Sequence, residues 1–129
     1  IKYLESLDLS YNYFDNIGFI IKNFEEISEK NLKNFTSLNL NGNYILKLDK
    51  IFPSNLKNLK ELYLNYNDIS SIDRDVFENL NSLEKLDLRE NQIKKIDNSK
   101  TFDSLSNSLT ILRISHFEFD SESLWHYIT

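Results

Sequence analysis

Several residue types are scarce in this sequence, and each absence excludes a class of structure or site. The 129 residues contain no cysteine, so the chain can form neither a disulfide nor a metal site with thiolate ligands. The same absence means that cysteine usage does not reveal the redox compartment. The only glycines and the only proline are Gly18, Gly42 and Pro53, which argues against a flexible linker and predicts a single domain over residues 1–129.

Long apolar runs and an excess of positive charge are also missing. The longest apolar candidate, residues 17–21, is far shorter than the roughly 18 residues of a membrane span, so we expect no membrane segment in this chain. Fifteen basic residues stand against 20 acidic ones, and the net charge of −5 argues against bulk binding to nucleic acid. There is no initiator methionine and no signal peptide. We therefore expect a segment of a longer protein, or a mature chain without its leader.

One pattern is repeated along the chain. Four stretches read LxxLxLxxNxL with conservative apolar exchanges, and a fifth keeps the spacing but has Phe117 in the asparagine column. These stretches are LESLDLSYNYF (4–14), FTSLNLNGNYI (35–45), LKELYLNYNDI (59–69), LEKLDLRENQI (83–93) and LTILRISHFEF (109–119). The asparagine column falls at spacings of 31, 24 and 24 residues, on Asn12, Asn43, Asn67 and Asn91. Self-similarity at such a period is typical of proteins built from stacked repeats.

Within each pattern, apolar and polar residues alternate as in a short strand with one buried face. In the third stretch, for example, Leu62 and Leu64 would face the core and Tyr63 the solvent. We therefore predict five parallel strands in one curved sheet, near residues 6–10, 37–41, 61–65, 85–89 and 111–115. Each coil buries its apolar residues mainly against its neighbours, so about three or more coils are needed for stability.

The asparagine column has a role of its own. An amide both donates and accepts hydrogen bonds, so a ladder of asparagines satisfies loop backbone groups that the stack would otherwise bury unpaired. Phe117 has no amide, so the ladder is predicted to end at Asn91. We predict that Phe117 and Phe119 pack against the fourth coil and that a short helix follows from Ser121. The alternative is a disordered chain end.

The segments between the patterns vary in length and composition. The first repeat is seven residues longer than the 24-residue spacing, and its residues 23–35 place Phe24, Ile27 and Leu32 as in an amphipathic helix on the outer surface. In the third repeat, Ile72 and Phe77 provide inward residues of an irregular coil. The side opposite the sheet is thus predicted to be irregular or helical.

The spacing LxxLxLxxNxIxxIxxxxFxxLxx, met by residues 59–82, resembles the 24-residue class of leucine-rich repeat that is common in extracellular proteins. The phrases LDLSYN (7–12) and TFDSLSNSLTIL (101–112) resemble the ectodomains of Toll-like receptors and of the arthropod chaoptin group. This resemblance implies an α/β leucine-rich repeat solenoid with a curved parallel sheet. Its repeats would start near residues 4, 35, 59, 83 and 109, within a longer solenoid. The cysteine-rich caps, transmembrane segment and signalling domain of such receptors are absent from this sequence.

The same resemblance implies a function. A receptor or adhesion ectodomain, such as those of innate immunity, is extracellular or on the cell surface and binds a protein or other macromolecular ligand on its concave face. Asn34-Phe35-Thr36 is the one N-glycosylation sequon, and it fits a secreted chain, although chance is the alternative in so asparagine-rich a sequence. A cytoplasmic scaffold or regulatory subunit built from the same coil is the alternative function.

Candidate binding residues are the exposed positions of the strands and of the two residues after each strand. Tyrosine and arginine are the most informative of them, because they combine a large contact area with hydrogen bonding. The alternative is that they are solvated surface residues. The candidates for the concave face are Asp8, Tyr11, Asn39, Tyr63, Tyr66, Asp87, Arg89, Arg113 and His116.

Catalysis and metal binding find little support. The only histidines, His116 and His126, have no cysteine partner and no HExxH spacing. Asp73 and Asp75 resemble the start of an EF-hand loop, but the glycine and the terminal glutamate do not follow. We therefore expect a binding module that is not an enzyme and that needs no cofactor or metal.

Overall fold

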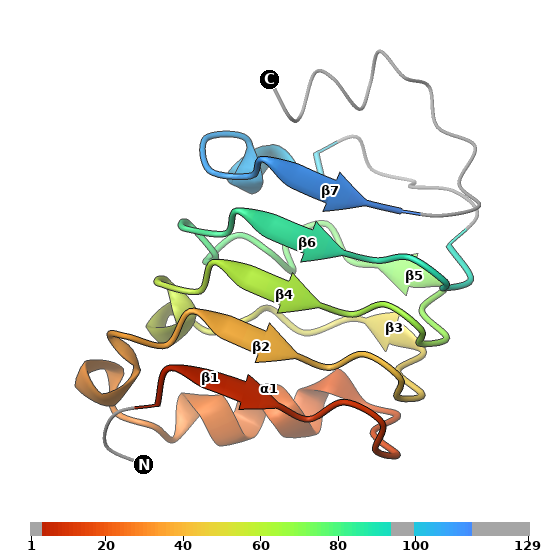
Figure 1. The fold of residues 1–129 in the computed structure, drawn as a ribbon. Coiled ribbons are helices and arrows are strands. Elements are labelled where there is room, and N and C mark those ends of the chain that lie inside the picture. Colours follow the sequence, from red (N-terminus) through yellow and green to blue (C-terminus); the bar gives the residue numbers. More distant parts are fainter. Residues whose placement is uncertain (1–3, 94–99, 115–129) are drawn as a thin grey trace.

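The computed structural model describes residues 4–93 and 100–114, which form a stack of coils (Figure 1). We number the coils by their starting residues, with the first coil at 4–34, the second at 35–58, the third at 59–82, the fourth at 83–108 and the fifth from 109. Each coil contributes one strand to a parallel sheet of five strands in the order β1-β2-β4-β6-β7. The strands are β1 (Ser6–Asp8), β2 (Ser37–Asn39), β4 (Glu61–Tyr63), β6 (Lys85–Asp87) and β7 (Ile111–Arg113). The predicted five-stranded parallel sheet is therefore confirmed.

Each strand has three residues and is shorter than the five residues predicted. The backbone ladder nevertheless continues past the strand ends, because the N–H groups of Leu9 and Tyr11 donate to the carbonyls of Asn39 and Asn41 at 2.8 and 2.9 Å. The register matches the sequence alignment, since the central leucines of neighbouring strands pair with one another: Leu7, Leu38, Leu62, Leu86 and Leu112.

The connecting segments lie behind the sheet in Figure 1, on the side predicted to be irregular or helical. The first coil holds α1 (Ile17–Glu25) and the 3₁₀ helix η1 (Glu29–Leu32). Later coils are tighter and contribute β3 (Lys47–Leu48), η2 (Ser54–Leu56), β5 (Ser71–Ile72) and η3 (Asp103–Leu105). The short strands β3 and β5 pair in parallel as a second, two-stranded sheet.

The position of the helix in the first coil corrects the prediction. We expected an amphipathic helix within residues 23–35, but α1 ends at Glu25 and is followed by a single 3₁₀ element. The helix begins earlier because the side-chain oxygen of Asn16 accepts a hydrogen bond from the N–H group of Gly18 at 2.7 Å, which caps the first turn. Its buried residues recur at helical spacing, on Ile17, Ile20, Ile21 and Phe24.

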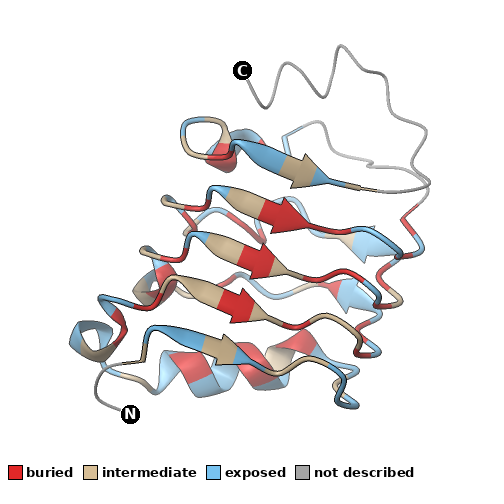
Figure 2. Cartoon of the chain, in the orientation of Figure 1, coloured by how far each residue is buried: buried red, intermediate tan, exposed pale blue. Residues whose placement is uncertain are grey.

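The core runs through the stack between the sheet and the connecting segments, and Figure 2 shows buried residues at the centre of the inner strands. A column of phenylalanines stacks along it. The rings of Phe52 and Phe77 lie 6.2 Å apart at an interplanar angle of 9°, and those of Phe77 and Phe102 lie 5.9 Å apart at 16°. All three side chains are buried, so Phe77 faces inward as predicted.

Some sequence-based predictions fall on residues that the structure does not describe. Phe117 and Phe119, the helix predicted from Ser121, and both histidines lie outside the described residues. Within residues 4–93 and 100–114, no helix has the length and apolar character needed to cross a membrane.

Candidate recognition surface

One face of the five-stranded sheet is covered by no described element (Figure 1). We call it the open sheet face. The paired strands align two rows of side chains on it, because residues two apart on a strand share a face. One row holds Ser6, Ser37, Glu61, Lys85 and Ile111, and the other holds Asp8, Asn39, Tyr63, Asp87 and Arg113.

The second of these rows was predicted from the alternation of the strands, and the first was missed. Glu61 and Lys85 belong to the missed row and contact Tyr63 directly. The Tyr63 hydroxyl donates to Glu61 Oε2 at 2.9 Å, and Lys85 Nζ lies 5.0 Å from the centre of the Tyr63 ring. Burial raises the pKa of Tyr63, and the bond to Glu61 raises it further. Tyr63 thus lies on the open side of the sheet as predicted, but it is half-buried, and Glu61 and Lys85 hold it in one orientation.

Asp87 is buried beneath Arg89. Arg89 Nε lies 2.9 Å from Asp87 Oδ1 and Arg89 Nη2 lies 2.7 Å from Oδ2, so the ion pair is bidentate. The Asp87 side chain is only 2% exposed, and the carboxylate raises the pKa of Arg89 through these hydrogen bonds and its charge. Asp87 was a candidate for direct ligand contact. The structure removes it from the accessible residues and leaves it the role of orienting Arg89.

The chain leaves the first, second and fourth strands through the same turn. The side-chain oxygens of Asp8, Asn39 and Asp87 accept hydrogen bonds from the N–H groups two residues later, at 2.9, 3.0 and 3.1 Å. In Asp8, the bonds from the Ser10 hydroxyl and N–H lower the pKa of the exposed carboxyl, which stays charged at neutral pH. One residue further along, the described coils take a left-handed backbone conformation, at Tyr11, Gly42, Tyr66 and Glu90.

Two of these left-handed positions are tyrosines, although glycine is the residue that adopts this conformation without strain. Tyr11 and Tyr66 both have a φ of 55° and are 75% and 57% exposed. The Tyr11 ring lies against Gly42, since a Cβ atom there would sit 2.6 Å from Tyr11 Cδ1. Gly42 occupies the equivalent position in the second repeat, directly before the asparagine of the repeat pattern, and a glycine at this position is the sequence signal for the left-handed conformation.

Two further tyrosines follow the asparagine column and were missed from the sequence. The rings of Tyr13 and Tyr44 stack with centroids 6.0 Å apart and planes 7° apart, and both are exposed. Together with the left-handed tyrosines they form what we call the tyrosine edge: Tyr11, Tyr13, Tyr44 and Tyr66. This edge lies where the chain leaves the first three strands of the open sheet face.

The asparagine side chains bridge successive coils. Asn67 illustrates the arrangement: its Oδ1 accepts from the N–H of Ile45 at 3.1 Å, and its Nδ2 donates to the carbonyls of Leu40 and Leu64 at 3.0 and 3.1 Å. Asn43 and Asn91 make equivalent bonds to the coils that precede them. The ladder thus fixes the turn that presents each left-handed residue.

Comparison with known families agrees with this geometry. A leucine-rich repeat profile matches residues 33–93, and a second one matches residues 3–27, so that the two ranges span about two thirds of the chain. The chain belongs to the leucine-rich repeat family. Leucine-rich repeat domains are typically non-catalytic binding modules, and they generally mediate recognition between proteins. No curated protein matches this chain.

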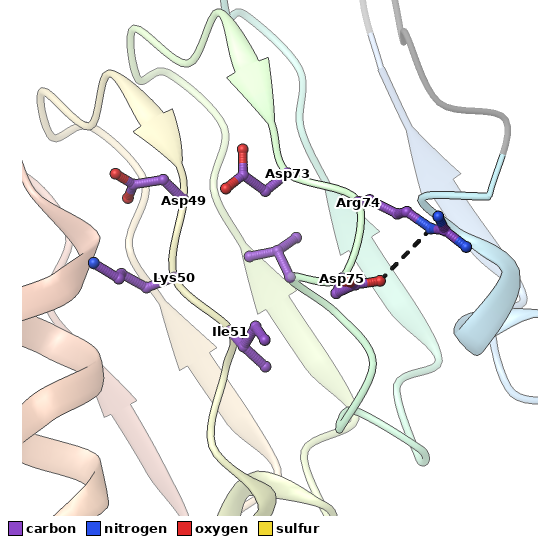
Figure 3. Close-up of a pocket in the computed structure, with 7 residues that line it drawn as sticks. Asp49, Lys50, Ile51, Asp73, Arg74 and Asp75 are labelled. Atoms are coloured by element: carbon purple, nitrogen blue, oxygen red, sulfur yellow. Dashed lines mark ion pairs between the residues drawn. The ribbon is translucent and has the colours of Figure 1, made fainter.

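The remaining candidates lie elsewhere on the leucine-rich repeat stack. Asn34 of the sequon is exposed just before β2. Asp73 and Asp75 line a pocket of 340 Å³ together with Asp49, behind the sheet (Figure 3). Arg74 pairs with Asp75 at 3.8 Å, and the described residues contain no cluster of three or more acidic or histidine side chains arranged to hold a metal.

Proposed function

We propose that this leucine-rich repeat chain recognises a protein partner through its open sheet face and the adjoining tyrosine edge. The observation that carries the proposal is that four exposed tyrosines lie where the chain leaves the first three strands of an uncovered sheet. Tyrosine and arginine are the residue types that dominate binding energy at protein interfaces. Arg89 and Arg113 are exposed on the same face of the later coils, which extends the aromatic surface with cationic groups.

Several of these side chains are already held in one geometry. Tyr63 is fixed by Glu61 and Lys85, Arg89 by Asp87, and Tyr13 by Tyr44. A side chain that is ordered before binding loses less conformational entropy when the partner arrives. The turn that the asparagine ladder fixes also holds the backbone of Tyr11 and Tyr66 in one conformation.

We further propose that the chain belongs to a receptor or adhesion ectodomain outside the cell. Support comes from the 24-residue pattern with its inward Phe77, from the Toll-like and chaoptin-like phrases, and from the exposure of Asn34. Expression through the secretory pathway of cultured cells tests the last point. The chain should gain the mass of one glycan, and an Asn34→Gln variant should not. A secreted chain without a glycan would contradict the use of this site.

The recognition surface itself is tested by photo-crosslinking. A photoreactive phenylalanine analogue replaces Tyr66 on the tyrosine edge or, as a control, exposed Glu78 behind the sheet. Both variants are exposed to a cell-surface protein extract of the source organism. Position 66 should give a discrete adduct that excess unlabelled chain abolishes. No adduct at position 66, or an adduct at position 78 alone, would contradict the proposal.

A further inference from the structure

The charged side chains of the open sheet face are unevenly distributed. Of the residues in β1 and β2, only Asp8 is charged, and its exposed carboxylate stays ionised at neutral pH. At the other end of the sheet, β6 and β7 are neighbours (Figure 1), and three cationic side chains lie on them or directly after β6. We call Lys85, Arg89 and Arg113 the cation cluster. The face therefore has an acidic end and a cationic end.

The carboxylates that lie among these cations are already engaged. Asp87 is buried and holds Arg89 in the bidentate ion pair described above. Glu61 accepts a hydrogen bond from the Tyr63 hydroxyl at 2.9 Å. The two carboxylates thus fix their neighbours in place.

Lys85 and Arg113 have no carboxylate partner within residues 4–93 and 100–114, where the ion pairs are made by other cations. Both lie near the ring of Tyr63. Lys85 Nζ is 5.0 Å from the centre of this ring. Burial raises the pKa of Tyr63, and the positive charge of Arg113 opposes that rise, so Arg113 lies close enough to interact with the hydroxyl. Two neighbouring strands thus bring cations without carboxylate partners to one aromatic side chain.

The composition of the chain makes this grouping informative. Twenty acidic residues stand against 15 basic ones, so carboxylates outnumber cations, and exposed Lys47 and Lys57 each pair with one. Lys85 and Arg113 lie instead beside a third cation. Like charges that are grouped repel one another, and a carboxylate placed among them relieves this repulsion and forms favourable pairs. The cation cluster is therefore suited to an anionic group from another molecule.

We propose that the cation cluster binds an acidic segment of the protein partner, whose carboxylates pair with Lys85 and Arg113 beside the oriented guanidinium of Arg89. Charge complementarity of this kind selects partners and sets their orientation. The acidic part of the segment lies over β6 and β7, and a neutral or basic part lies toward Asp8. The inference rests on the proposed function for the partner being a protein, and it adds the chemistry that this partner must present.

A synthetic peptide tests the cation cluster without the partner. The probe has about 12 residues of alternating glutamate and glycine, and its control has glutamine in place of glutamate. In a titration of the isotope-labelled chain, the glutamate peptide should give saturable shifts of the Arg89 and Arg113 Nε–H signals. Raising the salt from about 50 to about 200 mM should weaken this binding about threefold or more, because salt screens the charges. Equal binding of the glutamine peptide, or shifts that do not saturate, would overturn the proposal.

Two double variants with the same loss of charge locate the binding. Lys85→Gln with Arg113→Gln keeps Arg89, whose removal would leave a buried carboxylate unpaired, and should weaken the glutamate peptide about fivefold or more. Lys22→Gln with Lys33→Gln removes two exposed cations from the connecting segments and should stay within about twofold. Unfolding midpoints verify that both variants are folded. Equal weakening in the two variants would mean that only net charge matters and would overturn the proposal.

Two further measurements separate the remaining outcomes. An oligothymidylate of equal charge that binds more tightly than the glutamate peptide would assign the cation cluster to phosphate groups and would overturn the proposal. The protein captured at position 66 should bind the variant without Lys85 and Arg113 about fivefold or more weakly. Full affinity would overturn the acidic-segment proposal and leave recognition through the open sheet face intact. Saturable binding of the glutamate peptide without any adduct at position 66 would contradict the proposed function alone.

Discussion

At the scale of the residue, the sequence predicts well those side chains whose role depends on local repetition. The column of asparagines could be assigned to inter-coil bonds because an amide recurs wherever the chain turns off a strand. The burial of Asp87 could not be predicted in this way, because its partner Arg89 occurs at that position only in the fourth coil. Glu61 and Lys85 lie two residues before Tyr63 and Asp87 and therefore share their face of the sheet, but the sequence-based prediction covered only the residue between the two leucines and the two residues after them.

Asn67 and Asn12 provide a matched pair of variants for the ladder. Asn67→Ala removes bonds to Ile45 N–H and to the carbonyls of Leu40 and Leu64, and it leaves these buried groups unpaired. We expect a loss of about 2–4 kcal/mol in the free energy of unfolding, measured by urea denaturation. Asn12→Ala removes only exposed bonds within one coil and should cost less than about 1 kcal/mol. Equal losses for the two variants would contradict the bridging role of Asn67.

The left-handed tyrosines make a second prediction at this scale. A non-glycine residue with φ near 55° is strained by its Cβ atom, so Tyr66→Gly should be more stable than Tyr66→Ala by about 1 kcal/mol. Both variants lose the same ring, so their difference isolates the backbone. Chemical denaturation of the two proteins measures it. An alanine variant as stable as the glycine variant would show that the backbone at position 66 leaves the left-handed region.

At the scale of the element, strands were easier to predict than the helix. Five strands share one pattern, so each copy supports the others, and a parallel sheet is the arrangement that buries every leucine face at once. The helix α1 occurs in a single coil and has no copy to compare. The sequence does contain the apolar stripe of this helix over residues 17–24. Because four of residues 17–21 are apolar, that stretch also looks like a short apolar run, which hides the helical spacing. The prediction also did not include Asn16 as the N-cap.

The capping of α1 is open to a direct test. Asn16→Ala removes the oxygen that accepts from the N–H of Gly18, and it should lower the free energy of unfolding by about 1 kcal/mol. Asn16→Asp keeps an acceptor and should stay within about 0.5 kcal/mol of the original chain. Thermal unfolding followed by circular dichroism compares the three proteins. An aspartate variant as unstable as the alanine variant would mean that the cap does not set the start of the helix.

At the scale of the whole molecule, the repeat period specifies the stack and leaves the partner undetermined. The spacings of 31, 24, 24 and 26 residues between successive repeats predict which residues lie side by side in neighbouring coils, and the observed register agrees with them. The tyrosine edge depends on residues that differ between coils, so no period predicts it. Tyr13 and Tyr44 stack because the same column carries tyrosine in two successive coils, which only an alignment of the coils reveals.

The open sheet face is tested most directly by titrating the protein captured at position 66 against two double variants with unchanged net charge. Tyr63→Ala with Tyr66→Ala should weaken the affinity about tenfold or more, because two aromatic side chains are lost from the interface. Lys33→Ala with Glu78→Ala alters exposed residues of the connecting segments and should stay within about twofold of the original chain. Unfolding midpoints verify that both variants are folded. Full affinity in the tyrosine variant, with a loss in the control, would contradict recognition through the open sheet face.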